Sequence, residues 1–208
     1  MKTELLLPIE ASGRHVHLSQ HDMEVLFGSG FEMEKIRPLG GGNFLTPHKV
    51  KVAASNGRSC ICSVLGPCRK ISQVEVSYTE ARAIGLVPPL GDTGNDYNWD
   101  PITIVGPEGE VHLERGIFVA RRHVHLPIEL AEILGVQEDD DVDLRIPGER
   151  PTTFHGVKVR IPPKGVHDTV IHLDYDEYNA AAIFNCKEGY ISKPSSQTDE
   201  APNDPALE

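Results

Sequence analysis

A five-residue segment that occurs twice is the strongest constraint on how this chain can fold. The order Arg-His-Val-His-Leu stands at 14–18 and returns at 122–126. In an extended backbone the side chains of residues i and i+2 point to one face, so each copy would present two imidazoles together. Imidazole nitrogens are frequent ligands of zinc and neighbouring metals. The repeat therefore predicts an internal duplication built around metal sites.

A second pair of matching segments offers a third ligand for each site. Residues 74–80 and 171–177 share one order: apolar, ligand-type residue, apolar, small or acidic, Tyr, and a polar helix start. Glu75 and His172 hold the same place in it. Two histidines with a glutamate, and three histidines, are zinc ligand sets that leave a coordination position open. The predicted sets are His15, His17 and Glu75 in the first half and His123, His125 and His172 in the second.

Charge and hydropathy narrow the class of protein. The 208 residues carry a formal net charge of −11 and no long basic run, so nucleic acid is not an expected partner. No segment reaches the roughly twenty apolar residues of a membrane span. The apolar run at Leu5–Leu7 is too short for a signal peptide. We therefore expect a soluble, cytoplasmic protein.

The four cysteines do not form a Cys-x-x-Cys motif; they are Cys60, Cys62, Cys68 and Cys186. Reduced thiols in a cytosolic protein are the simplest interpretation. A separate zinc site of the first three is an open alternative, although the first two share one face of an apolar strand and are expected to pack in the core.

Short apolar runs separated by turn signals predict a mainly β fold with short α-helices. Such spacing favours small barrels over a parallel sheet. Helices are expected where capping residues precede amphipathic runs, at 20–27, 127–134, 79–84 and 175–184. With the repeat, this pattern predicts two similar small β-barrel domains.

Domain boundaries follow from the repeat and from loop composition. We expect a first barrel half at 1–87, a linker loop at 88–101, a second half at 102–186, and an acidic, disordered tail at 187–208. The exposed strand edges of small barrels would also allow a homodimer.

Other residues carry weaker signals. Arg69 precedes the strand of Glu75, where its guanidinium could bind phosphate, although for these residues taken alone a solvated surface pair of Arg69 and Lys70 is the better interpretation. The glycines at 40–42 could bring backbone amides to a phosphate, or form a plain turn. By strand alternation, Arg14 and Arg122 should point away from the imidazoles.

Four ordered motifs give the chain a family resemblance. They are Arg-His-Val-His-Leu-Ser at 14–19, Leu-Gly-Pro-Cys-Arg-Lys at 65–70 with Gln-Val-Glu at 73–75, the second Arg-His-Val-His at 122–125, and Ile-His-Leu-Asp at 171–174. Together they resemble the PduL-type phosphate acyltransferases, also called phosphate propanoyltransferases or phosphotransacylases, over about residues 6 to 182.

The resemblance implies reversible transfer of a short acyl group between coenzyme A and phosphate. It implies two β-barrels with two zinc ions where they meet, one bound by each predicted ligand set, and Arg69 as the phosphate-binding residue. Acyl-CoA, CoA, phosphate and acyl phosphate are the implied partners. Some members work in bacterial microcompartments of propanediol degradation, so such a compartment is an alternative location.

The two implied zinc ions and Arg69 together suggest direct attack of phosphate on a metal-polarised propanoyl or acetyl thioester. Cys68 is an alternative nucleophile, because a nearby cation lowers the pKa of a thiol. Two other functions stay open: a two-metal hydrolase of an ester or amide, and a non-enzymatic zinc-binding module.

Overall fold

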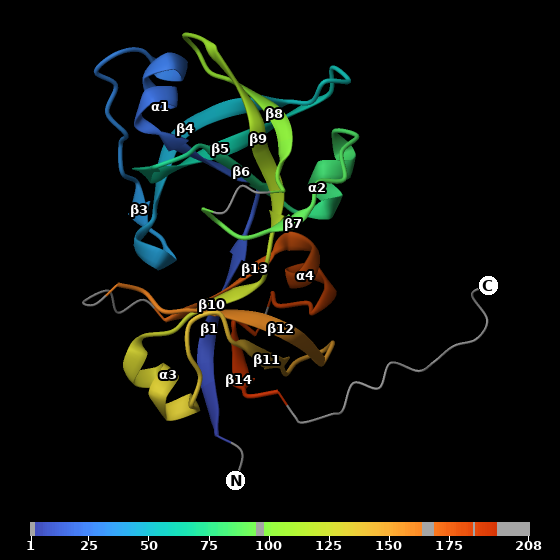
Figure 1. Ribbon diagram of the computed structural model, residues 1–208. Helices are drawn as coiled ribbons and strands as arrows, with labels where there is room; N and C mark the ends of the chain where they lie inside the picture. The colour runs from blue at the N-terminus through green and yellow to red at the C-terminus, as the bar shows by residue number, and fades with distance from the viewer. Residues whose placement is uncertain (1–2, 95–97, 164–168, 185, 195–208) are drawn as a thin grey trace, which may run out of the picture.

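The computed structural model describes residues 3–94, 98–163, 169–184 and 186–194. Within these ranges the chain is mainly β, with four short α-helices, which confirms the predicted fold class. Two strand assemblies lie one above the other, with the helices around them (Figure 1). None of the helices in the described part has the length and apolar character needed to cross a membrane.

The lower assembly in Figure 1 is a closed barrel. Its strands, in order around the barrel, are β1 (Glu4–Ser12), β13 (Val170–Asp174), β10 (His123–His125), β12 (Thr152–Arg160), β11 (Asp141–Ile146) and β14 (Glu188–Ser192). Strand β10 pairs in parallel with β12 and antiparallel with β13. The second His-x-His segment thus lies between two strands of this barrel.

The upper assembly follows the same order of pairings. Its circuit of paired strands is β4 (Phe44–Ala53), β5 (Ser59–Arg69), β2 (His15–Ser19), β6 (Gln73–Val76), β9 (Glu110–Ala120) and β8 (Asp100–Val105), which pairs back with β4. Two short strands, β3 (Arg37–Pro38) and β7 (Leu90–Gly91), pair with β4 and β9. Strand β2 pairs in parallel with β5 and antiparallel with β6, as β10 does with β12 and β13. A duplication accounts for this correspondence and stays our interpretation.

The strand just before each His-x-His segment joins the other assembly. Strand β1 precedes β2 in sequence but pairs with β13 and β14 of the lower barrel. Strand β9 precedes β10 but pairs with β6 and β8 of the upper assembly. The strand sets therefore differ from the predicted halves 1–87 and 102–186, while the division into separately folding domains stays a prediction. The reason is burial: Leu7 and Ile9 enter the lower core, whereas Ile117 and Val119 enter the upper one.

The prediction of a disordered tail from residue 187 onward is wrong over β14. Its residues pair antiparallel with β1 and β11, for example Leu5 with Ile191 and Asp143 with Ser192. Ile191 is fully buried, and this burial outweighs the polar composition around it. Residues 195–208 of the predicted tail lie outside the described residues.

Helices α1 (Gln20–Phe27) and α4 (Tyr175–Ala180) begin at the predicted residues, and α2 (Tyr78–Ala83) and α3 (Ile128–Leu134) each begin one residue away from them. Helix α1 is capped by Ser19, whose side chain accepts a hydrogen bond from the backbone N–H of Asp22. Helix α4 ends earlier than predicted, because the backbone at Ala182 turns to a φ of 51° and leaves the helical region.

Each assembly has its own hydrophobic core, and the His-x-His segment of each assembly contributes residues to that core. Val16 and Leu18 are fully buried in the upper core, as are Val124 and Leu126 in the lower one. Because alternate residues of a strand point to opposite faces, the histidines between them point away from the cores. The fold thus aims four imidazoles out of the cores near the junction of the two assemblies.

Candidate metal and phosphate site

The two predicted ligand sets each come together. His15, His17 and Glu75 bring their ligand atoms within 4.8 Å of one another, and so do His123, His125 and His172. The strand register explains this: Glu75 lies opposite His15 across β2 and β6, and His172 lies opposite His123 across β10 and β13. Both groups have the donor atoms of a zinc site, and their role in metal binding stays a prediction.

The first set is buried. Its members are 7%, 1% and 6% exposed, so almost no water reaches the Glu75 carboxylate or the two imidazoles. Burial alone would raise the pKa of Glu75, but His15, whose Nε2 lies 3.6 Å from a carboxylate oxygen, holds that pKa well below its usual range. Burial, together with His15 and Arg69, lowers the pKa of His17 well below its ordinary value. A neutral His17 and an ionised Glu75 are the protonation states that a metal ion needs.

The second set is a cluster of three imidazoles. The Nε2 atom of His123 lies 3.1 Å from Nδ1 of His172, and the rings of all three histidines meet edge to face at centroid distances of 5.0 to 5.2 Å. Burial, followed by the charge of His172, lowers the pKa of His123 to about 3. At neutral pH the His123 imidazole is therefore uncharged and can donate its lone pair to a metal.

Backbone carbonyls orient one imidazole in each set in the same way. Nδ1 of His15 lies 2.8 Å from the carbonyl oxygen of Gly13, and Nδ1 of His123 lies 2.9 Å from that of Arg121. A proton on each Nδ1 would donate to these carbonyls and leave Nε2 free as a ligand, as in many histidine metal sites. Nδ1 of His17 is buried without a hydrogen-bond partner in the described part of the chain. A metal ion would satisfy this nitrogen, so the residues fit a bound metal.

Three further residues support the ligands, and sequence reasoning missed them. Gln73 Nε2 donates to Glu75 Oε1 at 2.6 Å, and Thr93 Oγ1 donates to the same oxygen at 3.0 Å. Glu10 Oε2 lies 3.5 Å from Nε2 of His172. Gln73 could have been predicted from the sequence, because it stands two residues before Glu75 on one strand. The sequence gives no indication of Glu10, because β1 reaches His172 only through the exchange of strands.

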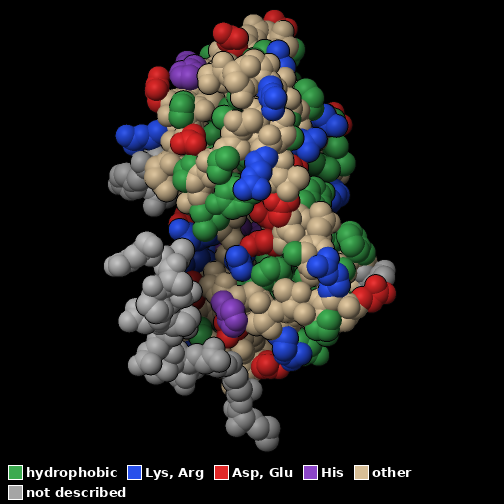
Figure 2. All heavy atoms as spheres, turned by 90° about the vertical axis from the view of Figure 1, so that its right-hand side faces the viewer, with side chains coloured by type: hydrophobic (Ala, Val, Ile, Leu, Met, Phe, Trp, Pro, Cys, Tyr) green, Lys and Arg blue, Asp and Glu red, His purple; other side chains and the backbone are tan. Residues whose placement is uncertain are grey.

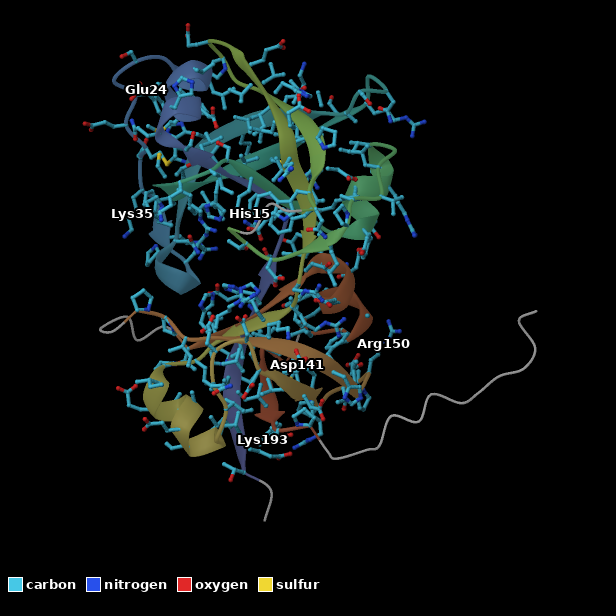
Figure 3. The ribbon with its side chains drawn as sticks, viewed as in Figure 1. His15, Glu24, Lys35, Asp141, Arg150 and Lys193 are labelled. Atoms are coloured by element: carbon cyan, nitrogen blue, oxygen red, sulfur yellow. The ribbon has the colours of Figure 1, made fainter. Side chains whose placement is uncertain are left out.

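Arg69 faces the same cavity as both ligand sets. This cavity, about 820 Å³ in volume, is bordered by residues of both assemblies, including the six predicted ligands and Arg69. His15, labelled in Figure 3, lies on the side of the upper assembly that faces the lower one. Burial lowers the pKa of Arg69, and no carboxylate lies within 4.0 Å of its guanidinium among the residues that the structure describes. The charge of Glu75 acts on Arg69 without forming an ion pair, so the N–H groups of this partly buried cation are suited to bind an anion.

The two arginines that begin the repeated segments bind helix caps. Arg14 Nη1 lies 3.0 Å from Glu80, and Arg122 Nε lies 2.8 Å from Glu177. Each of these glutamates completes the capping box of the helix that follows a strand with a third ligand, α2 or α4. The arginines thus fasten each His-x-His segment to the neighbouring helix, and Arg14 also borders the cavity.

The cysteines lie apart from both ligand sets. All four are free thiols, and Sγ of Cys60 lies 3.8 Å from Sγ of Cys62 on one face of β5. No cysteine belongs to a metal-binding group among the described residues.

On the face shown in Figure 2, basic and acidic side chains are interspersed over both assemblies rather than separated by sign.

Glu177 makes stability depend on pH. Burial is the main cause that raises its pKa to about 7, and Arg122 opposes this rise. The folded state therefore keeps a proton that the unfolded state loses above about pH 4.5, so the contribution of Glu177 to stability is present below that pH and lost as pH rises to about 7. We expect the free energy of unfolding of wild type, relative to Glu177→Gln, to fall over this interval in urea titrations. Glutamine can still cap the helix, and a constant difference between the two proteins would contradict the prediction.

Comparison with known proteins identifies the family of this chain. Residues 8–184 match the model of the family described as phosphate propanoyltransferase. Among curated proteins of that name, one from Lachnoclostridium phytofermentans is 39% identical over 183 residues, covering 88% of this chain and 85% of the relative. Another, from Priestia megaterium, is 40% identical over 187 residues, covering 89% and 85%. A third, from Clostridioides difficile, is 38% identical over 181 residues, with 86% of each chain covered. The chain belongs to the phosphate propanoyltransferase family and is a phosphotransacylase.

Proposed function

We propose that this chain is a zinc-dependent phosphate acyltransferase that reversibly converts a short-chain acyl-CoA, propanoyl-CoA or acetyl-CoA, and phosphate into acyl phosphate and CoA. One observation carries the proposal: two sets of three ligands border one cavity together with a partly buried arginine, and among the described residues no carboxylate lies within 4.0 Å of that guanidinium. The name of the related proteins supports the same reaction. The cavity volume of about 820 Å³ is in the range of small-molecule sites.

The donor atoms support zinc as the metal, one ion for each set. Nitrogen and carboxylate donors suit zinc, and a three-ligand set leaves a position for substrate, whereas structural zinc sites are closed by four ligands. The buried, unpartnered Nδ1 of His17 and the carbonyl-oriented imidazoles of His15 and His123 support the same assignment. When metal is bound, the two sets supply Lewis-acid chemistry that polarises a carbonyl group and stabilises developing negative charge.

The chain's own residues bind and orient phosphate. In our proposal the guanidinium of Arg69 donates to two phosphate oxygens and keeps a third directed at the thioester. That oxygen forms a bond to the carbonyl carbon, and the carbon–sulfur bond breaks with its electron pair going to the sulfur of CoA. The hydrogen phosphate loses its proton to solvent, and the CoA thiolate takes one proton from solvent. Acyl phosphate forms without a covalent acyl-enzyme.

The surroundings of Cys68 argue against it as a nucleophile. Its Sγ donates to Met23 Sδ at 3.6 Å, on the side of helix α1, and Cys68 is not among the residues that line the cavity. Burial raises the pKa of this thiol, so the reactive thiolate is disfavoured at neutral pH.

We therefore expect Cys68→Ala to retain activity within about threefold of wild type, because a thiol outside the cavity has no step to perform. The measurement is the steady-state rate of thiol release from propanoyl-CoA with phosphate. A drop to background, in protein with normal metal content, would show instead that an acyl-cysteine forms.

The reaction itself is tested by thiol release from acetyl-, propanoyl- and butanoyl-CoA, with and without phosphate, in protein of known metal content. Release that requires phosphate supports the acyltransferase and ranks its substrates. Release that is indifferent to phosphate would favour a two-metal hydrolase, and no release at all from metal-loaded protein would favour a zinc-binding module.

A homodimer and packaging in a microcompartment stay predictions, as does a cytoplasmic location.

A further inference from the structure

The glycine turn of the upper assembly lies against the three-histidine set of the lower one. The turn, η1 (Gly40–Gly42), connects β3 to β4. A Cβ atom at Gly40 would come within 3.1 Å of His172 Nε2, and one at Gly41 within 3.0 Å of His125 Nε2. Gly41 also has a φ of 69°, which residues with side chains rarely adopt. Only a turn without side chains can approach these imidazoles so closely.

Asn43 joins this turn to Arg69. Its Nδ2 donates to the carbonyl oxygen of Gly40 at 2.9 Å, and its Oδ1 accepts from Nη2 of Arg69 at 3.0 Å. The carbonyl of Asn43 also accepts from the N–H of Leu39 at 2.9 Å, which closes the turn. Asn43, Arg69 and Gly40 all border the cavity. A short chain of hydrogen bonds thus runs from the guanidinium to the turn that covers the second ligand set.

The side-chain amide of Asn43 can hold Arg69 in place and still leave its charge available to an anion. A guanidinium has five N–H donors. One N–H donor of Arg69 is bonded to the amide oxygen of Asn43. A neutral acceptor fixes the orientation of the long side chain without neutralising its charge. A carboxylate in that place would form an ion pair and compete with phosphate for the same donors.

We propose that Asn43 is a positioning residue for phosphate, which orients Arg69 and fastens it to the glycine turn beside the three-histidine set. This inference rests on the proposed function, because it concerns the phosphate of that reaction. Asn43 touches Arg69 rather than the reacting atoms. Its loss should therefore weaken phosphate binding and leave the affinity for the thioester unchanged.

Two variants test the role of the amide. Asn43→Ala removes both hydrogen bonds and should raise KM for phosphate about tenfold, with KM for propanoyl-CoA changed less than about twofold. Asn43→Asp places a carboxylate beside Arg69 and should raise KM for phosphate further than Asn43→Ala does. The control is Asn179→Ala on helix α4, an exposed asparagine that does not line the cavity and should behave as wild type.

Direct binding of inorganic phosphate, measured by titration calorimetry on metal-loaded protein, separates this inference from the proposed function. Weaker phosphate binding in Asn43→Ala, with metal content unchanged, supports the positioning role even if wild type shows no thiol release. Phosphate affinity within twofold of wild type would overturn it. So would an equal rise of KM for both substrates or a loss of bound metal, because these indicate a general structural role.

Discussion

Replacing His123 by alanine is expected to remove about one metal ion per chain and to reduce phosphate-dependent thiol release by about 10³-fold or more. His123 belongs to the second ligand set, and its ring contacts the rings of both His125 and His172. Its low pKa keeps the imidazole neutral, and a proton on Nδ1 that is donated to the carbonyl of Arg121 would leave Nε2, the nitrogen that faces His172, with a lone pair for the metal. Removing it leaves two ligands, too few for a stable zinc site of this kind.

The measurement combines metal analysis by mass spectrometry with the thiol-release assay. The control is His21→Ala, which removes an exposed histidine of helix α1 that does not line the cavity and should keep both metal and activity. Full activity in His123→Ala would refute the assignment of the second set. A loss of activity with two metal ions retained would mean that His123 acts in some other way than as a ligand.

Replacing Arg69 by alanine is expected to lower kcat/KM for phosphate by about 10²-fold or more, while both metal ions stay bound. The guanidinium is partly buried and borders the cavity, and no carboxylate of the described residues lies within 4.0 Å of it. Without it, the cavity loses the cation that we propose for phosphate. Lysine should restore only part of the activity, because an ammonium group cannot form the two parallel hydrogen bonds of a guanidinium.

The assay is thiol release at varied phosphate and fixed propanoyl-CoA. Arg150→Ala is the matched control, since Arg150 is an exposed arginine on the outside of the lower assembly (Figure 3). Unchanged KM for phosphate in Arg69→Ala would refute the phosphate-binding role. If activity fell equally with and without phosphate, the hydrolase would become the better reading.

His123→Ala and Arg69→Ala remove different parts of the proposed reaction. His123→Ala tests the metal and should affect every reaction that the site performs. Arg69→Ala tests the acceptor of the acyl group and should affect only the reaction with phosphate. Their combination therefore distinguishes a metal-dependent acyltransferase from a metal-dependent hydrolase.

Much of the site was predictable from the sequence because its ligands lie on short, regular segments. Strand alternation alone places His15 beside His17 and His123 beside His125. The repeated pattern added Glu75 and His172, and the structure brings each to its predicted set. Helix starts were equally local, since a cap such as Ser19 acts on the next three residues.

The tertiary structure alone decided which strands share a barrel and which side chains support the site. Pairing of β1 with β13 joins residues far apart in sequence, and no local pattern encodes such a partner. The same holds for β14, which burial of Ile191 draws into the barrel despite its polar surroundings. Glu10 and Asn43 reach His172 and Arg69 only because the chain crosses between the assemblies and turns on three glycines. The sequence by itself determined the donor atoms, which depend on local spacing; the fold determined their neighbours, which depend on long-range burial and pairing.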